Sequence, residues 1–514
     1  MKLTKHYIKV TILMVSLLVA TACHDLLQEE AENRSFNDEI DYTSESDMIL
    51  PLLGVYAEFY ARGWEDYPLI SVRGDDVNAG GKDDQQDFTE TDLFNYSNKS
   101  FWMYRQVWEN LYKDTYYAYS AIDQIALYKE NVANKALADQ YMAEAKVLGA
   151  YWLFTLSRMW GSVFIPFSAD PTDLLVAKPF SKDEVMQHIS DQMDEVIPLL
   201  PALHPSERTD IPGGVTQYTA LAIKALANLE LENYQKVADA TSQIISSSKF
   251  ALEPEFYQLF KLKGKLNDEN ILELQYSDFG TAAGTDKKFP FDVFGPQAWS
   301  PKVKGATSGW GFFEPSLKYI KFMLDRNEVV RLQTSVLFTK DGIAKIKSDP
   351  AYATLPAWIS HITPSGDTIN NYYRALFASG KHYLPSEQLT PGRTSYGTNK
   401  NVTCIRYAEI LLIHAEALTM GASSGVMTAD EAVNAVRFRA GLGDVSGVTH
   451  DQVMDEKFAE LAMEWGIRFY DMVRLNEFNE LSYDGRVFTQ SDIFLPYPQN
   501  QVDQLPVLQD FTQE

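Results

Sequence analysis

The sequence predicts a mostly α-helical protein with one loop-rich segment that carries a few short strands. Apolar residues recur at intervals of three and four along most of the chain, which is the spacing of one helix face. Capping boxes, in which a hydroxyl and an acid or amide satisfy each other's backbone N–H groups, open helices at Ser181–Glu184, Thr428–Glu431 and Thr449–Gln452. Residues 251–400 break the pattern because they are rich in Gly, Pro, Ser and aromatic residues.

The N-terminus has the features of a secretory leader. Lys2, Lys5 and Lys9 precede an apolar run of about 11 residues, which is shorter than the roughly 20 that span a bilayer. Small residues then lead into Cys23. We expect residues 1–22 to be a signal peptide and Cys23 to become the acylated first residue of a lipoprotein, since several acyl chains make a durable anchor. The alternative is an ordinary cleaved signal followed by a chance cysteine.

Composition limits the classes of partner. The formal charge is −25 and the pI about 4.8, which argues against nucleic acid and anionic membrane surfaces as ligands. Cys404 has no disulfide partner once Cys23 is acylated, so an exported protein of this kind must depend on its core. Hydrophobic residues make up 45% of the chain, which is enough material for that core.

The helical part begins after a polar stretch. Residues 23–47 are expected to form a flexible acidic tether. The repeat of apolar residues from Trp108 to Ile125 predicts a helix with one aromatic face, and a second helix is expected over residues 135–160. Four tryptophans at helical spacing are expected to belong to the core: Trp102, Trp108, Trp152 and Trp160.

Two helical hairpins are predicted further along. Residues 216–229 pair with 233–247, and residues 405–419 pair with 429–440, in the manner of tetratricopeptide units at irregular spacing. Between them, Asn270–Tyr276 alternates enough to predict a short strand, and the rest of residues 251–400 is expected to form long, ordered loops.

Several residues suggest an enzyme at first sight. Gly421–Gly425 matches the Gly-x-Ser-x-Gly elbow, but it joins two helices instead of following a strand. His414 and Glu416 match part of a deaminase motif that lacks its cysteines. Paired carboxylates for glycoside hydrolysis could come from Glu409, Glu416, Glu460 and Glu464. Nearby guanidinium groups would hold these acids ionised, which favours structural ion pairs: Arg406, Arg437, Arg439, Arg468 and Arg474. The sequence predicts no catalysis, cofactor or metal site, and it leaves open a structural calcium ion.

Two polar, aromatic loop regions are suited to a sugar. A pyranose stacks its apolar C–H face on an aromatic ring, and its hydroxyl rim binds Asp, Asn or Arg. The regions are residues 64–84 and 291–312. The predicted platforms are Trp64, Trp299 and Trp310, and the predicted polar contacts are Arg73, Asp75, Asp76 and Asn78. The alternatives are that the tryptophans fix loops onto the core and that Asp75, Asp76 and Asn78 form turns.

Six segments, in order, resemble a known family. One is Ile405-Arg-Tyr-Ala-Glu-Ile-Leu-Leu-Ile-His-Ala-Glu-Ala-Leu418, and the others are Glu144–Gly161, Gly214–Ala225, Asn434–Gly441, Glu460–Arg474 and Pro496–Gln509. Together they resemble the SusD/RagB family of outer-membrane nutrient-binding lipoproteins from Bacteroidetes. The departures are small: Trp465 stands where the family has an acidic or small residue, and the closing Gln-Asn is Gln509-Asp510.

The resemblance implies a SusD-like helical fold with tetratricopeptide-like pairs on one side and a loop-built ligand face on the other. It implies that residues 48–250 and 251–514 pack as one unit, and that ligand contacts come from the two loop regions. It also implies a non-catalytic lipoprotein on the outer membrane that faces the exterior, binds a polysaccharide or oligosaccharide and delivers it to a SusC-like TonB-dependent transporter. Two alternatives remain, which are oligopeptide binding for the same kind of transporter and a surface glycoside hydrolase.

Overall fold

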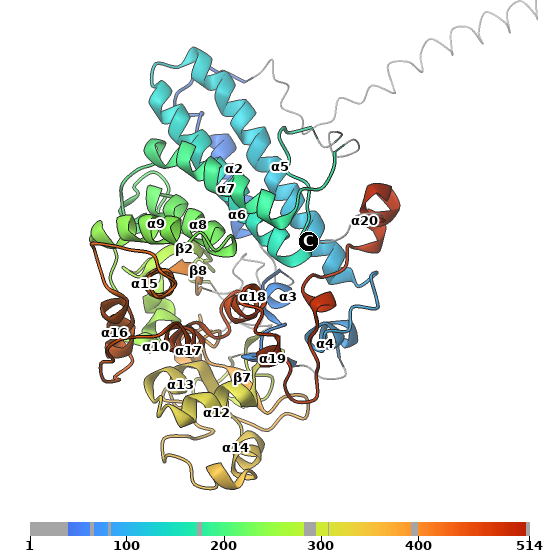
Figure 1. Ribbon diagram of the computed structural model, residues 1–514, viewed down its shortest axis with the longest axis vertical. Coiled ribbons are helices and arrows are strands. Elements are labelled where there is room, and N and C mark those ends of the chain that lie inside the picture. Colours follow the sequence, from blue (N-terminus) through green and yellow to red (C-terminus); the bar gives the residue numbers. More distant parts are fainter. Residues whose placement is uncertain are drawn as a thin grey trace, which may run out of the picture.

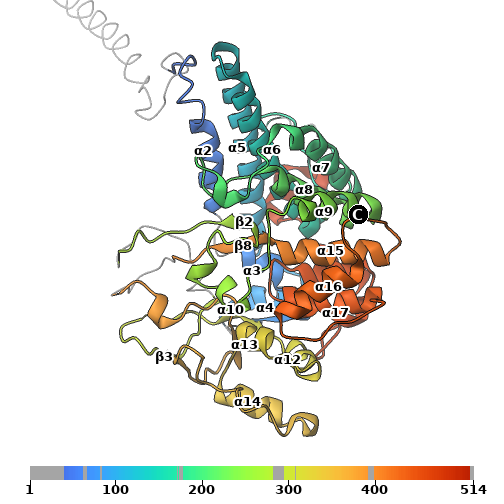
Figure 2. The same ribbon diagram turned by 90° about the vertical axis from the view of Figure 1, so that its left-hand side faces the viewer.

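The computed structural model describes residues 40–61, 66–80, 84–170, 172, 177–281, 294–306, 308–391 and 399–509. Helices dominate it, and the strands are short (Figure 1), so the predicted fold class is confirmed. In Figure 2 the helix pairs lie on one side, and the strands and long loops lie on the other. Within these described ranges, no helix is long and apolar enough to cross a membrane.

The upper part of Figure 1 is a layer of long helices. α2 (Leu50–Tyr60) packs against α5 (Trp102–Asn131), which packs along α6 (Lys135–Trp160). The predicted aromatic face is buried at Trp108, where its ring meets that of Trp160 edge to face with centroids 5.2 Å apart, and half-buried at Tyr119. Both helices expected from the periodicity are therefore present. Trp152 is also buried, whereas Trp102 is half-buried.

Part of the expected tether contacts this layer. The Tyr42 hydroxyl donates to the side-chain amide oxygen Oε1 of Gln124 at 2.9 Å, and the ring centroids of Tyr42 and Tyr128 lie 5.0 Å apart. The Glu45 carboxylate accepts the Asn134 N–H at 3.2 Å just before α6. Residues 40–47 thus pack on α5 and the turn that follows it.

A series of helices continues from this layer, each packed on the next. α6 packs on α7, α7 on α8, α8 on α9, and α9 on α15. The two predicted hairpins are confirmed, and all three predicted capping boxes are formed. The bounds are α7 Lys182–Val196, α8 Gln217–Glu230, α9 Tyr234–Ser246, α15 Tyr407–Thr419, α16 Ala429–Arg439 and α17 His450–Leu461.

The segment 251–400 is more regular than the sequence predicted. Its helices are four to nine residues long, too short for apolar periodicity to stand out. They are α10 Phe256–Leu259, α12 Leu317–Asp325, α13 Val330–Ser335 and α14 Lys340–Lys347. The predicted strand is confirmed as β2 (Asn270–Leu274).

The described strands form four antiparallel two-stranded ladders. Each joins segments that are distant in sequence, so the pairing could not be deduced from the local sequence of either strand. The pairs are β1 (Val77–Gly80) with β4 (Phe312–Pro315), β2 with β8 (Val402–Arg406), β3 (Trp299–Ser300) with β6 (Thr368–Ile369), and β5 (Val336–Phe338) with β7 (Phe377–Ser379).

Short elements complete the fold. The remaining α-helices are α3 Asp66–Ser71, α4 Gln86–Asp92, α18 Ile467–Arg474, α19 Phe478–Leu481 and α20 Gln499–Gln504. Single 3-10 turns lie at Ile197–Leu199, Pro205–Glu207, Leu262–Gly264, Pro350–Tyr352, Ser386–Gln388, Gln490–Asp492 and Pro506–Gln509.

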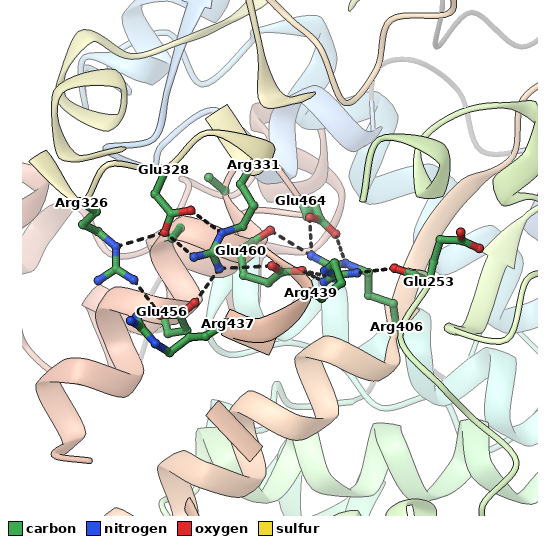
Figure 3. Close-up of polar contacts among 12 residues, drawn as sticks. Glu253, Arg326, Glu328, Arg331, Arg406, Arg437, Arg439, Glu456, Glu460 and Glu464 are labelled. Atoms are coloured by element: carbon green, nitrogen blue, oxygen red, sulfur yellow. Dashed lines mark hydrogen bonds and ion pairs between the residues drawn. The ribbon is translucent and has the colours of Figure 1, made fainter. Parts of the chain in front are cut away.

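An ion-pair lattice ties the central helices together (Figure 3). Buried Arg406 binds Glu269 at 2.8 Å, Glu460 at 2.6 Å and Glu464 at 2.8 Å. Burial opposes ionisation of Glu460, yet the surrounding guanidinium groups outweigh it and lower its pKa to about 2. The lattice extends through Arg326, Glu328, Arg331, Arg437, Arg439 and Glu456.

Candidate functional site

An exposed aromatic surface lies between β6 and β7 on the loop-rich side. We call Tyr372, Tyr373 and Arg374 the aromatic ledge. The side chain of Tyr373 is 76% exposed, and its ring centroid lies 5.2 Å from that of Tyr372. The guanidinium carbon of Arg374 lies 5.1 Å from the Tyr373 ring centroid, and its Nε donates to the Tyr373 hydroxyl at 2.6 Å. None of the three residues was predicted from the sequence.

A carboxylate completes the polar edge of the ledge. Arg374 Nη1 donates to Asp84 Oδ2 at 2.5 Å. Asp84 belongs to the first predicted loop region, just before α4. An exposed ring is therefore flanked by a matched pair of opposite charges, which offers both donors and an acceptor to hydroxyl groups.

The strand ladders position the ledge. Asn370 N–H donates to the carbonyl oxygen of Ala298 at 2.9 Å, which continues the β3–β6 ladder to the start of the ledge. On the far side, Glu314 of β4 accepts the N–H groups of Leu376 at 2.5 Å and Phe377 at 3.0 Å. Burial of Glu314 raises its pKa to about 7 against the lowering effect of these bonds.

The β1–β4 ladder brings the two predicted loop regions together. Gly80 stands opposite Phe312. Gly80 has φ +63°, and a Cβ there would lie 2.7 Å from the carbonyl oxygen of Gly311, so only glycine fits this approach. A Cβ on Gly311 would in turn lie 3.6 Å from Cε1 of Tyr372, so the ledge adjoins the second region. The predicted regions do meet, although through residues that were not predicted to contact a ligand.

Two of the predicted platform tryptophans are half-buried. Trp299 lies in β3 and packs against a small cluster that includes Ile369 and Tyr383. Trp310 packs against the main core. Each therefore has a packing role, and their role as ligand platforms stays a prediction. Trp64 and the acylation site Cys23 lie outside the described residues.

Asp75 and Asp76 correct the sequence prediction, because both carboxylates are buried. Arg468 donates to Asp75 at 2.7 and 3.0 Å, and Lys318 lies 2.6 Å from it. Asp76 accepts the Met463 N–H at 2.5 Å, and burial raises its pKa to about 6. The expected ligand contacts of both residues are wrong, since each carboxylate instead joins distant parts of the chain.

Arg73 is a third correction. It is fully buried, donates to the Ile493 carbonyl oxygen at 2.9 Å and lies 4.2 Å from the ring centroid of Phe469. Asn78 is half-buried and accepts from the Tyr483 hydroxyl at 2.8 Å. Asn78 therefore supports the base of the β1–β4 ladder, and ligand contact by its amide stays a prediction.

The residues considered for catalysis have structural roles. Glu416 binds Lys457 at 2.9 Å and Arg474 at 2.6 Å, while Glu460 and Glu464 belong to the lattice of Figure 3. The prediction of structural ion pairs is confirmed for these three acids. Glu409 is also buried, and burial raises its pKa to about 7.

The serine and histidine motifs are equally structural. Gly421–Gly425 links α15 to α16, as the sequence predicted. The His414 ring lies within hydrogen-bond distance of the Thr241 hydroxyl at 2.7 Å and of the Met427 carbonyl oxygen at 3.1 Å. Among the residues that the structure describes, no group of three or more His, Cys, Asp or Glu side chains could hold a metal ion.

Comparison with known proteins gives a consistent result. The SusD family model matches residues 268–511. A SusD-like protein of Bacteroides ovatus is 23% identical and covers 98% of this chain and 97% of its own length. The solved surface glycan-binding protein A of Bacteroides thetaiotaomicron, in complex with laminarihexaose, has a TM-score of 0.72 at 21% identity, with 91% of this chain and 99% of that chain covered. A laminarin-binding SusD-like protein has a TM-score of 0.74 at 21% identity, over 90% of this chain and 98% of that one.

The sequence segments, the helical fold with its opposite loop face, and these matches agree: residues 268–511 match the SusD family model, and the chain has a SusD-like fold.

Proposed function

We propose that this protein is a non-catalytic surface protein that binds a polysaccharide or oligosaccharide, and that the aromatic ledge is part of its binding site. The observation that carries the proposal is the 76% exposed ring of Tyr373 beside the Arg374–Asp84 pair. A sugar ring can stack its C–H face on the tyrosine while its hydroxyls exchange hydrogen bonds with the charged groups. Because the two charges balance, the site suits an uncharged glycan.

The relatives support a glycan as the ligand. Two solved proteins of the same fold are described as binding laminarin or its hexasaccharide. Three of the four acids that could serve hydrolysis, Glu416, Glu460 and Glu464, are buried in ion pairs, and Glu409 is buried as well, which supports binding without cleavage.

The N-terminal sequence and the similarity to SusD-like proteins support a location at the cell surface. We propose that Cys23 carries acyl chains that hold the protein on the outer membrane, facing the exterior, and that a SusC-like TonB-dependent transporter receives the bound glycan. The leader pattern of residues 1–22 supports the export step.

Titration calorimetry of plant, fungal and host glycans, laminarin included, tests the proposal. Tyr372→Ala combined with Tyr373→Ala should weaken binding of the best glycan about tenfold or more, since about 1.4 kcal/mol of lost stacking gives that factor. Tyr373→Phe should bind nearly as well as wild type, because it keeps the stacking face. Phe438→Ala is the matched control, since this phenylalanine is 80% exposed on α16.

Three results would contradict the proposal. Unchanged affinity of the double variant would remove the ledge from the site. Release of reducing sugar from the bound glycan would favour the hydrolase alternative. Binding of a peptide mixture, with no glycan bound, would favour oligopeptide uptake.

A further inference from the structure

A second concave surface lies far from the ledge in the fold, between α2 and α5. This α2–α5 groove has a volume of about 730 Å³, within the range of ligand sites. Its lining is more apolar than polar and includes Val55, Ala121 and Tyr128. Neither the ion-pair lattice nor the proposed glycan site uses it.

Apolar side chains at the rim of the groove are open to solvent. Leu50 is 57% exposed and Tyr117 is 45% exposed, and both line the groove. Single exposed leucines are ordinary on protein surfaces. Here, however, the exposed groups border a concave apolar surface, which is the arrangement of a helix-binding groove.

Gly54 is an independent indication that the groove accommodates another molecule. It lies in the middle of α2, where glycine costs about 1 kcal/mol relative to alanine. A Cβ at this position would meet nothing within 4 Å, so packing does not require glycine here. Because Gly54 lines the groove, its missing side chain leaves room for another molecule.

The shape and charge of the groove indicate its occupant. On α5 its lining runs from Tyr117 to Tyr128, which is about 16 Å, or three helical turns. The charged residues of the described lining are Asp41 and Asp47. Both lie at the Tyr128 end of the groove, where burial together with their negative charges raises the pKa of the Tyr128 hydroxyl. We propose that the groove binds an amphipathic helix of about three turns from a partner polypeptide, with its apolar face on α2 and α5 and Lys or Arg over Asp41 and Asp47.

The probe is a fluorescein-labelled helical peptide of about 14 residues, with leucines at i, i+3, i+4 and i+7 and lysines at one end. Anisotropy should show saturable binding to the wild-type protein. Gly54→Leu should lower the affinity more than about tenfold, because its side chain fills the groove. It should fold at least as well as wild type, since leucine favours the helix and a Cβ at this position would meet nothing within 4 Å. Leu53→Glu is the matched control, because Leu53 is 40% exposed on the same helix but lies outside the lining.

The negatively charged chain will attract any basic peptide, so a second control separates fit from charge. A peptide of the same composition, with its leucines spread around the helix, should bind at least tenfold more weakly at about 0.5 M salt, where exposed charges are screened. Equal binding of the two peptides, or wild-type affinity in Gly54→Leu, would overturn the proposal. So would a dimer that Gly54→Leu dissociates in the absence of peptide binding, because a second copy would then be the occupant.

Discussion

Arg374 and Asp84 form a hydrogen-bonded ion pair at 2.5 Å although 290 positions separate them in the chain. The pair links the ledge to the segment that precedes α4. It also holds the guanidinium group against the ring of Tyr373. An exposed tyrosine thereby has a defined neighbour on one side, which limits the orientations that its ring can take.

Asp84→Asn should weaken glycan binding by about three- to tenfold while leaving stability nearly unchanged. The reason is that exposed ion pairs contribute about 0–1 kcal/mol to folding, whereas loss of the negative charge weakens the hold on Arg374 and replaces one acceptor oxygen by an NH2 donor. Calorimetry and urea unfolding measure the two effects. Lys249→Ala, which breaks the exposed pair with Glu207, is the control. Wild-type affinity in Asp84→Asn would exclude the pair from the site.

The two half-buried tryptophans allow a separate test of the sequence prediction. Trp299→Ala and Trp310→Ala should each lower the free energy of unfolding by about 1–3 kcal/mol, since each indole buries apolar area against a cluster. If the indoles are also platforms, affinity for the glycan should fall at least tenfold in folded variants. If both variants bind as wild type does, the tryptophans only pack.

The ion-pair lattice should be costly to break at Glu460. Glu460→Gln leaves Arg406, Arg439 and Arg331 short of a buried counter-charge, and loss of one partner of a buried pair typically costs about 3–5 kcal/mol. Urea unfolding monitored by circular dichroism measures the change. Glu387→Gln removes an exposed partner of Lys302 and should cost less than about 1 kcal/mol. Equal effects of the two substitutions would contradict the role of the lattice.

Stability should pass through a maximum near pH 4.5, because two buried acids act in opposite directions. Burial raises the pKa of Glu409 to about 7, so its contribution is fully present below the ordinary glutamate value of 4.5 and is lost as pH rises through about 7. The pKa of Glu460 is lowered to about 2, so its contribution is present above 4.5 and is lost as pH falls through about 2.

Urea midpoints measured between about pH 2 and pH 8 would follow the fall in stability on both sides of this maximum, which we call the acid limb and the neutral limb. Glu409→Gln should make the neutral limb shallower and leave the acid limb unchanged, because glutamine does not titrate. Persistence of the full neutral limb in this variant would assign it to other buried acids, such as Glu273, whose pKa burial also raises to about 7.

The long helices could be predicted because their signals are local. The capping box at Ser181 and the aromatic repeat through Trp108 each lie within one element, and the structure has both. The short helices α10, α12, α13 and α14 gave no such signal. β2 was recognised as a strand, but its partner β8 lies more than a hundred residues away, so the pairing could not be deduced.

The candidate site was predicted by region but not by residue. Arg73, Asp75 and Asp76 have the composition of an exposed polar loop, yet their partners, such as Arg468, lie about 390 residues further along the chain. The adjacent pair Tyr372 and Tyr373, followed by an arginine inside the loop-rich segment, was a signal that the same chemical reasoning could have used.

The β1–β4 ladder has a consequence for any attempt to divide this protein. A fragment that stops near residue 250 keeps β1 but loses β4, and so presents an open strand edge that invites aggregation. The complementary fragment keeps Arg468 without the buried carboxylate that neutralises it. Neither piece is self-sufficient, so co-expressed halves should be recovered as one complex, whereas each half alone should be insoluble.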